Sequence, residues 1–389
     1  MSSEMTQANT QTGGTAKSAR QFPLDALRGL IMVLMALDHA NHFVAQGHSS
    51  GEYWGGLFPV YHDTLTFLTR FVTHLAAPGF FFLMGAGMVL FADARMQRGW
   101  SRWQVIRHFW LRGFVLIALQ FVVVNRAWEL SPGGWGLTVY VGVLFALGAA
   151  MMIGSLLVWI KPKYLLVLSI LLLIGTELLI PDVSSWNLLQ YSNPMDYLNQ
   201  FLIRPGGTID LWSNYPVFPW LELLTFGMFF GYALLDDREK AYRTGMLVGI
   251  AFLLVFVVVR YLDGYGNIRP REGNTWIDFL NLVKYPPSIT FTLLTTGINL
   301  ILLGLLARVR VSGQRFFLPL VVYGRVPLFF YVQHLFLYAG LGWLLARNGT
   351  TIARMLPVWL LGLLLLYPLC LWFGRCKQRY PANALIRLI

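Results

Sequence analysis

Long apolar runs follow one another along most of this chain, separated by short polar segments. A membrane-spanning helix needs about 20 apolar residues, because each residue adds about 1.5 Å and the hydrocarbon core is about 30 Å thick. The runs therefore predict ten membrane-spanning helices, at residues 24–45, 71–92, 109–126, 136–160, 164–181, 216–235, 244–262, 286–306, 318–346 and 355–374. The ninth run contains Gly324 and Pro327, which predicts a half-helix followed by a full one.

Basic residues mark one set of helix ends. Of the 30 lysines and arginines, 20 fall at the ends that include both termini and 8 at the opposite ends, while Arg70 and Arg325 lie just before or inside a span. Cytoplasmic loops of membrane proteins carry the excess of such residues. The pattern predicts an even number of helices with both termini in the cytoplasm.

Composition supports the same class of protein. Of the 389 residues, 56% are hydrophobic and 12% charged, which is too apolar for a soluble globule. The net charge of +12 comes from the short loops, so we interpret it as a topology signal and expect the lipid bilayer, and no nucleic acid, as a partner. Cys370 and Cys376 are the only cysteines, so neither a disulfide framework nor a metal site is expected. The polar residues 1–20 predict a disordered cytoplasmic leader, followed by a single transmembrane domain over residues 21–389.

Histidines are concentrated in one segment. The chain has no lysine or arginine from Gly29 to Thr69, and five of its seven histidines lie within 36 residues around this gap. The candidate functional residues in this segment are Asp38, His39, His42, His48, His62, Asp63 and His74. Such groups are costly to place at the end of a membrane helix, which makes them candidates for function.

Asp38 is the deepest of the carboxylates in this segment. It lies about 20 Å along the helix from Leu24, in the outer third of the bilayer core, so it must be paired or protonated. His42 is four residues further on and shares its face of the helix, while His39 lies beside them. A structural polar pair that fixes helix packing is the alternative interpretation. A neutral imidazole can act as a general base toward an amine or as a transient acyl carrier, and Asp38 or Asp63 could set its tautomer.

The opposite end of the first helix carries Asp25 and Arg28, three residues apart. A snorkelling arginine with a local ion pair is one interpretation. The other is that Arg28 and Arg112 form a fork for a phosphate-bearing cosubstrate. Arg325 lies inside a span, where it is costly unless it faces the bundle interior or a ligand.

The second helix begins with Arg70 and His74, which share a face at a spacing of four residues. Pro78 follows and removes a backbone donor at membrane depth. His74 as a packing residue and His74 as a catalytic residue both remain open. For His48 and His62, in the preceding loop, solvent exposure is the default expectation.

Four strings in this order, LDALRGLIMVLMALDHANHF, TRFVTHLAAPGFFFLMGAG, KYPPS and YGRVPLFFYVQH, resemble the bacterial membrane proteins related to heparan-α-glucosaminide N-acetyltransferase. The resemblance runs over nearly the whole chain. It implies a transmembrane acyltransferase that takes acetyl from cytoplasmic acetyl-CoA and delivers it to an amino sugar across the membrane. The family's catalytic histidine belongs to the first non-cytoplasmic loop, in a His-Ala-x-Trp-type context. The nearest string here begins at His48 and reaches Trp54, whereas His62 has the better spacing from the second helix.

We therefore expect an all-α, multi-pass protein of the inner cell membrane that acts as an acetyl-CoA-dependent acyltransferase on a small-molecule or glycan acceptor. The expected catalytic residues are Asp38, His39, His48, His62 and His74, and the expected acetyl-CoA site comprises Asp25, Arg28, Arg112 and Arg325. A proton-coupled secondary transporter with Asp38, His39 and His74 as its relay is the alternative, although no inverted repeat is evident. An inert membrane scaffold is a third interpretation. The sequence leaves the acceptor and the oligomeric state open, a homodimer included.

Overall fold

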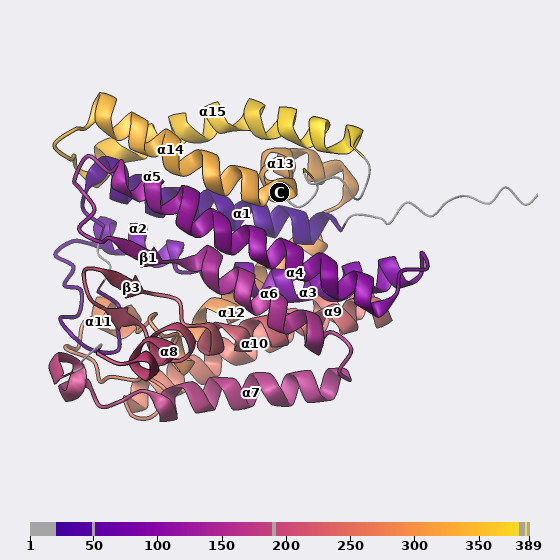
Figure 1. Cartoon of the computed structure of the whole chain (residues 1–389), viewed down its shortest axis with the longest axis horizontal. Helices are drawn as coiled ribbons and strands as arrows, with labels where there is room; N and C mark the ends of the chain where they lie inside the picture. The colour runs from indigo at the N-terminus through magenta and orange to yellow at the C-terminus, as the bar shows by residue number, and fades with distance from the viewer. Residues whose placement is uncertain (1–20, 49–50, 189–191, 381–385, 387–389) are drawn as a thin grey trace, which may run out of the picture.

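The computed structural model describes residues 21–48, 51–188, 192–380 and 386, so the expected leader, residues 1–20, lies outside the described range. The described chain is mostly helical, and its long helices run roughly side by side along the horizontal axis of Figure 1. The α-helices are α1 (Phe22–Ala40), α2 (Thr64–Thr73), α3 (Ala76–Met96), α4 (Arg102–Leu119), α5 (Asn125–Glu129), α6 (Val143–Leu157), α7 (Pro162–Leu179), α8 (Pro194–Leu202), α9 (Val217–Asp236), α10 (Arg238–Leu262), α11 (Trp276–Leu280), α12 (Ile289–Ala307), α13 (Leu318–Arg325), α14 (Pro327–Leu345) and α15 (Ile352–Arg379). The π-helical turns η1 (Asn41–Ala45) and η2 (Gln120–Val124) continue α1 and α4, and the 3₁₀ segments are η3 (Val183–Leu188) and η4 (Val311–Phe317).

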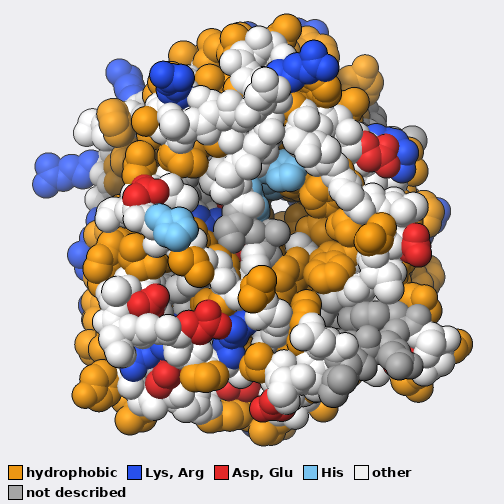
Figure 2. Space-filling model, turned by 90° about the vertical axis from the view of Figure 1, so that its left-hand side faces the viewer, with side chains coloured by type: hydrophobic (Ala, Val, Ile, Leu, Met, Phe, Trp, Pro, Cys, Tyr) orange, Lys and Arg blue, Asp and Glu red, His pale blue; other side chains and the backbone are white. Residues whose placement is uncertain are grey.

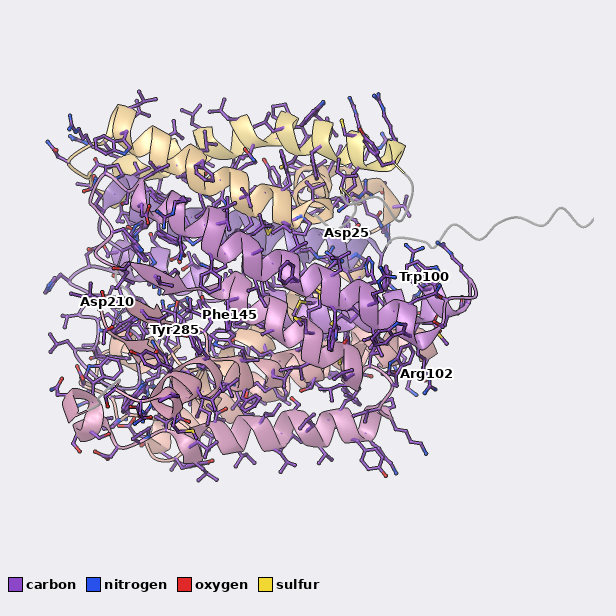
Figure 3. The ribbon with its side chains drawn as sticks, viewed as in Figure 1. Asp25, Trp100, Arg102, Phe145, Asp210 and Tyr285 are labelled. Carbon is purple, nitrogen blue, oxygen red and sulfur yellow. The ribbon has the colours of Figure 1, made fainter. Side chains whose placement is uncertain are left out.

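The start of α1 and the end of α15 lie at the same end of the bundle, on the right of Figure 1. We call this the terminal end, and we call the opposite end the loop end. Figure 3 shows Trp100 and Arg102 at the terminal end and Asp210 and Tyr285 toward the loop end.

Helices occur at all ten positions that the apolar runs predict. Among the described residues, eight helices are long and apolar enough to cross a membrane, counting α2 with α3 and α4 with α5 as single spans. Two of the ten predicted positions fall outside these eight. They hold α1, which carries Asp25, Arg28 and Asp38, and α6, which has only 15 residues. The chain is thus built as a multi-pass membrane protein.

A small three-stranded sheet at the loop end corrects the all-α expectation. Strand β1 (Val139–Val141) pairs in parallel with β3 (Leu211–Ser213), which pairs antiparallel with β2 (Gly206–Gly207). β1 takes up the start of the run that was predicted to span the membrane from residue 136, so α6 begins only at Val143. Apolar β-branched and aromatic residues suit a strand as well as a membrane helix, and a partner that is distant in the sequence decides between them here.

Two helix breaks follow from proline. The ninth run divides into α13 and α14 between Arg325 and Pro327, as predicted. The second run divides after Thr73, because Pro78 has no N–H to donate to the carbonyl oxygen of His74 four residues earlier.

Helices α1 and α13 touch backbone to backbone. A Cβ atom at Gly29 would lie 1.8 Å from the carbonyl oxygen of Leu320, and one at Gly324 would lie 2.0 Å from the carbonyl oxygen of Asp25. Only glycine permits so close an approach. The contact fixes Arg28, whose Nη1 donates to the carbonyl oxygen of Gly324 at 3.0 Å.

Candidate active site

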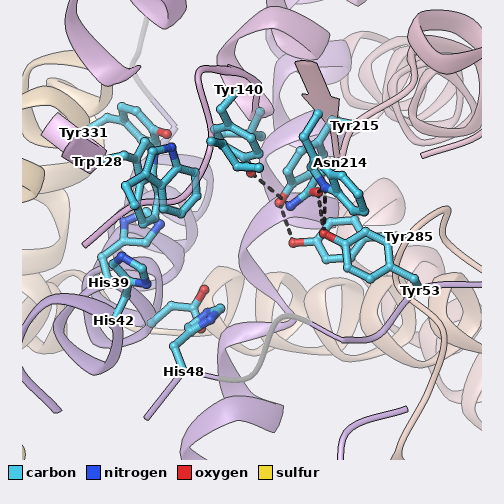
Figure 4. Close-up of a pocket in the computed structure, with 15 residues that line it drawn as sticks. His39, His42, His48, Tyr53, Trp128, Tyr140, Asn214, Tyr215, Tyr285 and Tyr331 are labelled. Atoms are coloured by element: carbon cyan, nitrogen blue, oxygen red, sulfur yellow. Dashed lines mark hydrogen bonds and ion pairs between the residues drawn. The ribbon is translucent and has the colours of Figure 1, made fainter. Parts of the chain in front are cut away.

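A cavity of about 390 Å³ opens at the loop end, where Figure 2 shows a hollow with histidine side chains at its edge. Figure 4 shows His39, His42 and His48 on one side of it, facing Tyr53 and Tyr285 on the other. The remaining lining residues are Asp38, Trp128, Trp135, Leu137, Tyr140, Val143, Trp212, Asn214, Tyr215 and Tyr331. We call this the loop-end cavity; it is predominantly aromatic.

Asn214 organises the wall opposite the histidines. Its Oδ1 accepts hydrogen bonds from the Tyr53 hydroxyl at 2.5 Å and from Trp212 Nε1 at 2.6 Å. Its Nδ2 donates to the Tyr140 hydroxyl at 3.0 Å. These side chains come from three separate segments, so the network holds β1, the end of β3 and the loop around Tyr53 in one arrangement. A ligand in this cavity meets aromatic faces together with hydroxyl and amide groups that can specify its orientation.

His39 lies on α1 at the inner side of the loop-end cavity. Its Nδ1 is 2.6 Å from Nε2 of His334, a fully buried residue of α14. The edges of Trp128 and Tyr331 meet the His39 ring, with ring centroids 5.2 and 6.3 Å away.

Arg70 is the centre of a buried ionic cluster beside this cavity. Its Nε and Nη2 each donate at 2.7 Å to an oxygen of Glu52, and its Nη1 donates at 2.6 Å to Asp38. The Thr73 hydroxyl donates to the same Asp38 oxygen at 2.8 Å, and His48 Nε2 lies 3.2 Å from it. The side chains of Arg70 and Glu52 are 2% and 0% exposed, so each charge depends on the other for compensation.

Asp38 therefore pairs with Arg70 and His48, and the pairing with His42 that the helical spacing predicted is wrong. At Asn41 the helix changes to a π-helical turn, so the spacing of four residues no longer brings two side chains onto one face. The His42 ring instead packs against Trp128, with centroids 4.7 Å apart.

Lys284 is a second buried basic residue in this cluster, besides Arg70. Its backbone N–H donates to the carbonyl oxygen of Glu52 at 2.9 Å. Burial lowers the pKa of Lys284 to about 8, and the charge of Arg70 acts in the same direction. Burial alone would raise the pKa of Glu52, but the charge and hydrogen bonds of Arg70 outweigh it and hold this pKa well below its ordinary value. Two carboxylates, Asp38 and Glu52, thus lie near two buried basic residues, Arg70 and Lys284.

This arrangement predicts how stability depends on pH at the alkaline side. In the unfolded chain Lys284 titrates near its ordinary pKa of about 10.4, whereas in the folded protein it titrates near 8. Between these values the unfolded state binds more protons, so the contribution of Lys284 makes folding more favourable as pH rises. The melting temperature of the wild type should therefore gain from this contribution between pH 8 and pH 10. The melting temperature of Lys284→Met should lack that gain. Lys240→Met, at an exposed position, should behave as the wild type; identical pH profiles for all three proteins would contradict the expectation.

A second cavity, of about 380 Å³, reaches in from the terminal end. Its interior is apolar and includes Phe80, Leu83, Met84, Met88, Leu144, Leu147 and Met151. Four basic residues line it, namely Arg28, Arg112, Arg325 and Lys377. We call this the terminal-end cavity.

The charges of the terminal-end cavity are not balanced. Asp25 lies 3.0 Å from Arg28 and 3.6 Å from Arg325. Arg112 has no carboxylate partner among the residues that the structure describes. It is instead repelled by the like charge of Arg28. Clustered guanidinium groups of this kind suit phosphate, and the apolar interior suits an attached chain.

The two cavities nearly meet. Val143 and Tyr331 line both of them. A small third cavity, of about 40 Å³, shares Phe80 with the terminal-end cavity and shares Asp38 and His39 with the loop-end cavity. His39 therefore lies next to the thin partition between the two cavities.

The structure brings most of the predicted residues to these cavities. Asp38, His39 and His48 line the loop-end cavity, and Arg28, Arg112 and Arg325 line the terminal-end cavity with Asp25 in contact. Other predicted residues lie elsewhere.

His74 is buried beside Glu52, with its Nε2 3.3 Å from a carboxylate oxygen, and does not line the loop-end cavity. His62 is exposed. Asp63 is also exposed, and its carboxylate caps the start of α2 by accepting from the backbone N–H of Thr66 at 2.9 Å.

Three residues of the site, Glu52, His334 and Asn214, were not predicted as functional from the sequence. Glu52 is a carboxylate within the gap that lacks lysine and arginine, so the gap itself could have indicated it. His334 stands in the string YGRVPLFFYVQH, but nothing nearby in the sequence indicates its partner. Asn214 has no recognisable signal, because its contacts come from distant segments.

The buried ionic cluster and the two cavities beside it thus lie among the helices of a multi-pass membrane protein. The chain belongs to the family described as heparan-alpha-glucosaminide N-acetyltransferase, catalytic, which matches residues 20–261. Heparan-alpha-glucosaminide N-acetyltransferase of Homo sapiens is 29% identical over 134 residues, which is 34% of this chain and 18% of the human protein. The matched segment thus covers less than a fifth of that relative's length. The family favours an acyltransferase over the transporter alternative.

Proposed function

We propose that the protein transfers an acetyl group from acetyl-CoA in the terminal-end cavity to an amino sugar or amino-bearing glycan in the loop-end cavity. The observation that carries this proposal is the pair of cavities that are both lined by Val143 and Tyr331 and are separated by these residues. One is basic with an apolar interior, and the other is aromatic and holds the histidines. Family membership supports the class of reaction.

The terminal-end cavity fits the donor. Arg28, Arg112 and Arg325 would hold phosphate groups, and the apolar side chains would hold the chain that carries the thioester. A thioester that reaches the partition would lie close to Tyr331.

At the partition, His39 is placed to act on the acceptor amine. As the amine nitrogen bonds to the thioester carbonyl carbon, the carbon–sulfur bond breaks and the sulfur keeps the electron pair. His39 takes the proton that the amine loses and returns it to the thiolate, so the products are the amide and the free thiol. Asp38 is neutralised by Arg70 and supports the helix end that carries His39.

For orientation, we propose ten crossings with the terminal end in the cytoplasm, in keeping with the 20 to 8 distribution of basic residues. Reporter fusions after Gly47 and after Asp237 should then report opposite sides of the membrane. Reporters on the same side would contradict the ten-helix topology.

The direct test uses purified protein in vesicles, with isotopically labelled acetyl-CoA and a panel of amino sugars. Labelled N-acetyl sugar should form with an acceptor of suitable shape. Failure with every amino sugar, together with transfer to a different acceptor class, would overturn the proposed acceptor.

Donor binding should depend on the arginines of the terminal-end cavity. Arg112→Ala should weaken acetyl-CoA binding at least tenfold, a loss of about 1.4 kcal/mol or more, because a charge-assisted phosphate contact is lost. Calorimetry with the purified protein measures this directly. Arg98→Ala, at an exposed loop position of the same end, is the matched control and should change binding little.

A second variant tests the same cavity without a change of charge. A Cβ atom at Gly87 would meet nothing within 4 Å, and Gly87 lines the terminal-end cavity. Gly87→Leu should therefore fold normally, while its side chain fills part of the cavity and weakens the binding of acetyl-CoA. Unchanged binding in both Arg112→Ala and Gly87→Leu would place the donor elsewhere.

A further inference from the structure

We infer that His334 is a positioning residue that fixes the tautomer of His39 and leaves His39 Nε2 as the unprotonated nitrogen that faces the cavity. This inference rests on the proposed function for its chemical meaning, but its structural content can be tested without any activity. It begins with the contact between the two rings.

The two imidazoles meet edge to edge. His39 Nδ1 and His334 Nε2 are 2.6 Å apart, while the ring centroids are 4.9 Å apart and the ring planes differ by 19°. Because the nitrogens are much closer than the ring centres and the planes are nearly parallel, the hydrogen bond lies near the plane of both rings. The lone pair of an imidazole nitrogen points in this direction.

The carbonyl oxygen of Phe330 sets the direction of that bond. His334 Nδ1 lies 3.0 Å from this oxygen, and a carbonyl oxygen can only accept, so Nδ1 of His334 carries the proton. In neutral His334 the other nitrogen, Nε2, is then an acceptor. His39 must donate from Nδ1, and in neutral His39 this leaves Nε2 without a proton.

The free nitrogen of His39 is open to the ligand space. His39 lines the loop-end cavity and the small cavity that continues toward Phe80, and Nε2 has no hydrogen-bond partner among the described residues. The carboxylate of Asp38, the neighbouring residue, is engaged by Arg70, Thr73 and His48. The tautomer of His39 is thus set by a buried histidine of another helix, and not by a carboxylate.

This arrangement suits proton transfer during acyl transfer. When His39 accepts the amine proton on Nε2, its Nδ1–H still donates to His334, and the bond strengthens because the donor is now charged. When the proton passes to the thiolate, His39 returns to its starting tautomer. His334 does not exchange a proton with the substrate at any point.

The test compares two substitutions of His334. His334→Leu removes the acceptor, and His334→Gln offers an amide oxygen in its place. His334→Leu should lower kcat by about tenfold or more with a smaller change in KM, as for the loss of a residue that orients a catalytic group, and His334→Gln should recover most of the rate. Tyr338→Phe, one turn further along α14, is the control and should retain the wild-type rate. Equal kcat values for His334→Leu and the wild type would overturn the inference.

The tautomer itself is read by ¹⁵N NMR of histidine-labelled protein in detergent, with the His39 signals assigned by their loss in His39→Ala. The wild type and Tyr338→Phe should show His39 protonated at Nδ1, and His334→Leu should shift the population toward the Nε2–H form. A wild-type protein with His39 protonated at Nε2 would overturn the inference, even if His334→Leu does not fold. A protein that shows the expected tautomer but transfers no acetyl group would instead refute the proposed function.

Discussion

Replacing Arg70 with methionine should destabilise the folded protein by about 3–5 kcal/mol, because it leaves buried carboxylates without their countercharge. Arg70 binds Glu52 through two hydrogen bonds and Asp38 through a third, and no solvent reaches Glu52. Methionine keeps much of the side-chain volume, so the loss of charge compensation dominates the effect. Thermal and denaturant unfolding of the purified protein in detergent would measure it.

An exposed ion pair of similar distance provides the control. Arg126 and Glu129 are 2.7 Å apart but 60% and 38% exposed, so Arg126→Ala should cost less than about 1 kcal/mol. Adding Glu52→Gln to Arg70→Met should restore part of the lost stability, because one of the uncompensated charges is then removed. If Arg70→Met unfolds under the same conditions as Arg126→Ala, the cluster does not stabilise the fold.

Replacing His39 with alanine should lower acetyl transfer by about 100-fold or more, the usual scale for the loss of a general base, while the protein stays folded. His39 is the histidine that lines both the loop-end cavity and the small cavity at the partition. Among the residues that the structure describes, His39 is the only histidine that lines the small cavity. Single-turnover transfer with labelled acetyl-CoA separates this chemical effect from donor binding, which should be nearly unchanged.

The other histidines distinguish this mechanism from its rivals. His48→Ala should reduce transfer less than His39→Ala, because His48 contacts Asp38 and Arg70 at the edge of the site. His62→Ala should retain the wild-type rate, since His62 is exposed outside the cavity. If His39→Ala is folded and active while His62→Ala is inactive, the loop histidine is the catalytic one and the assignment made from the cavities is wrong.

The apolar runs were sufficient to predict where the long helices lie and the break before Pro327. They also assigned Arg28 and Arg112 to one end, where both line a single cavity together with Arg325, which the runs placed inside a span. Such features depend on local sequence, because membrane helices must satisfy their own backbone hydrogen bonds and basic residues must lie at helix ends. Strand β1 escaped prediction because its pairing partner is distant in the sequence.

The polar contacts of the site could not be predicted in this way. The spacing between Asp38 and His42 assumed a regular α-helix, and the π-helical turn at Asn41 removed the basis for that assumption. Glu52 lies in a loop, where a carboxylate is ordinarily solvated, and its buried charge is compensated by Arg70 with His74 also in contact. The contact between His39 and His334 joins helices from opposite ends of the chain, and no local pattern encodes it.

The thin partition at Val143 and Tyr331 also has an electrical consequence. Where water enters the cavities from both ends, the low-dielectric path is shortened, so most of a membrane potential would fall between them rather than over the full thickness of the bilayer. An elementary charge that crossed this partition would gain or lose about 2.3 kcal/mol per 100 mV, nearly as much as in a complete crossing. In the proposed function the group that is transferred past this partition is a neutral acetyl group, so its transfer would neither draw on the membrane voltage nor be opposed by it.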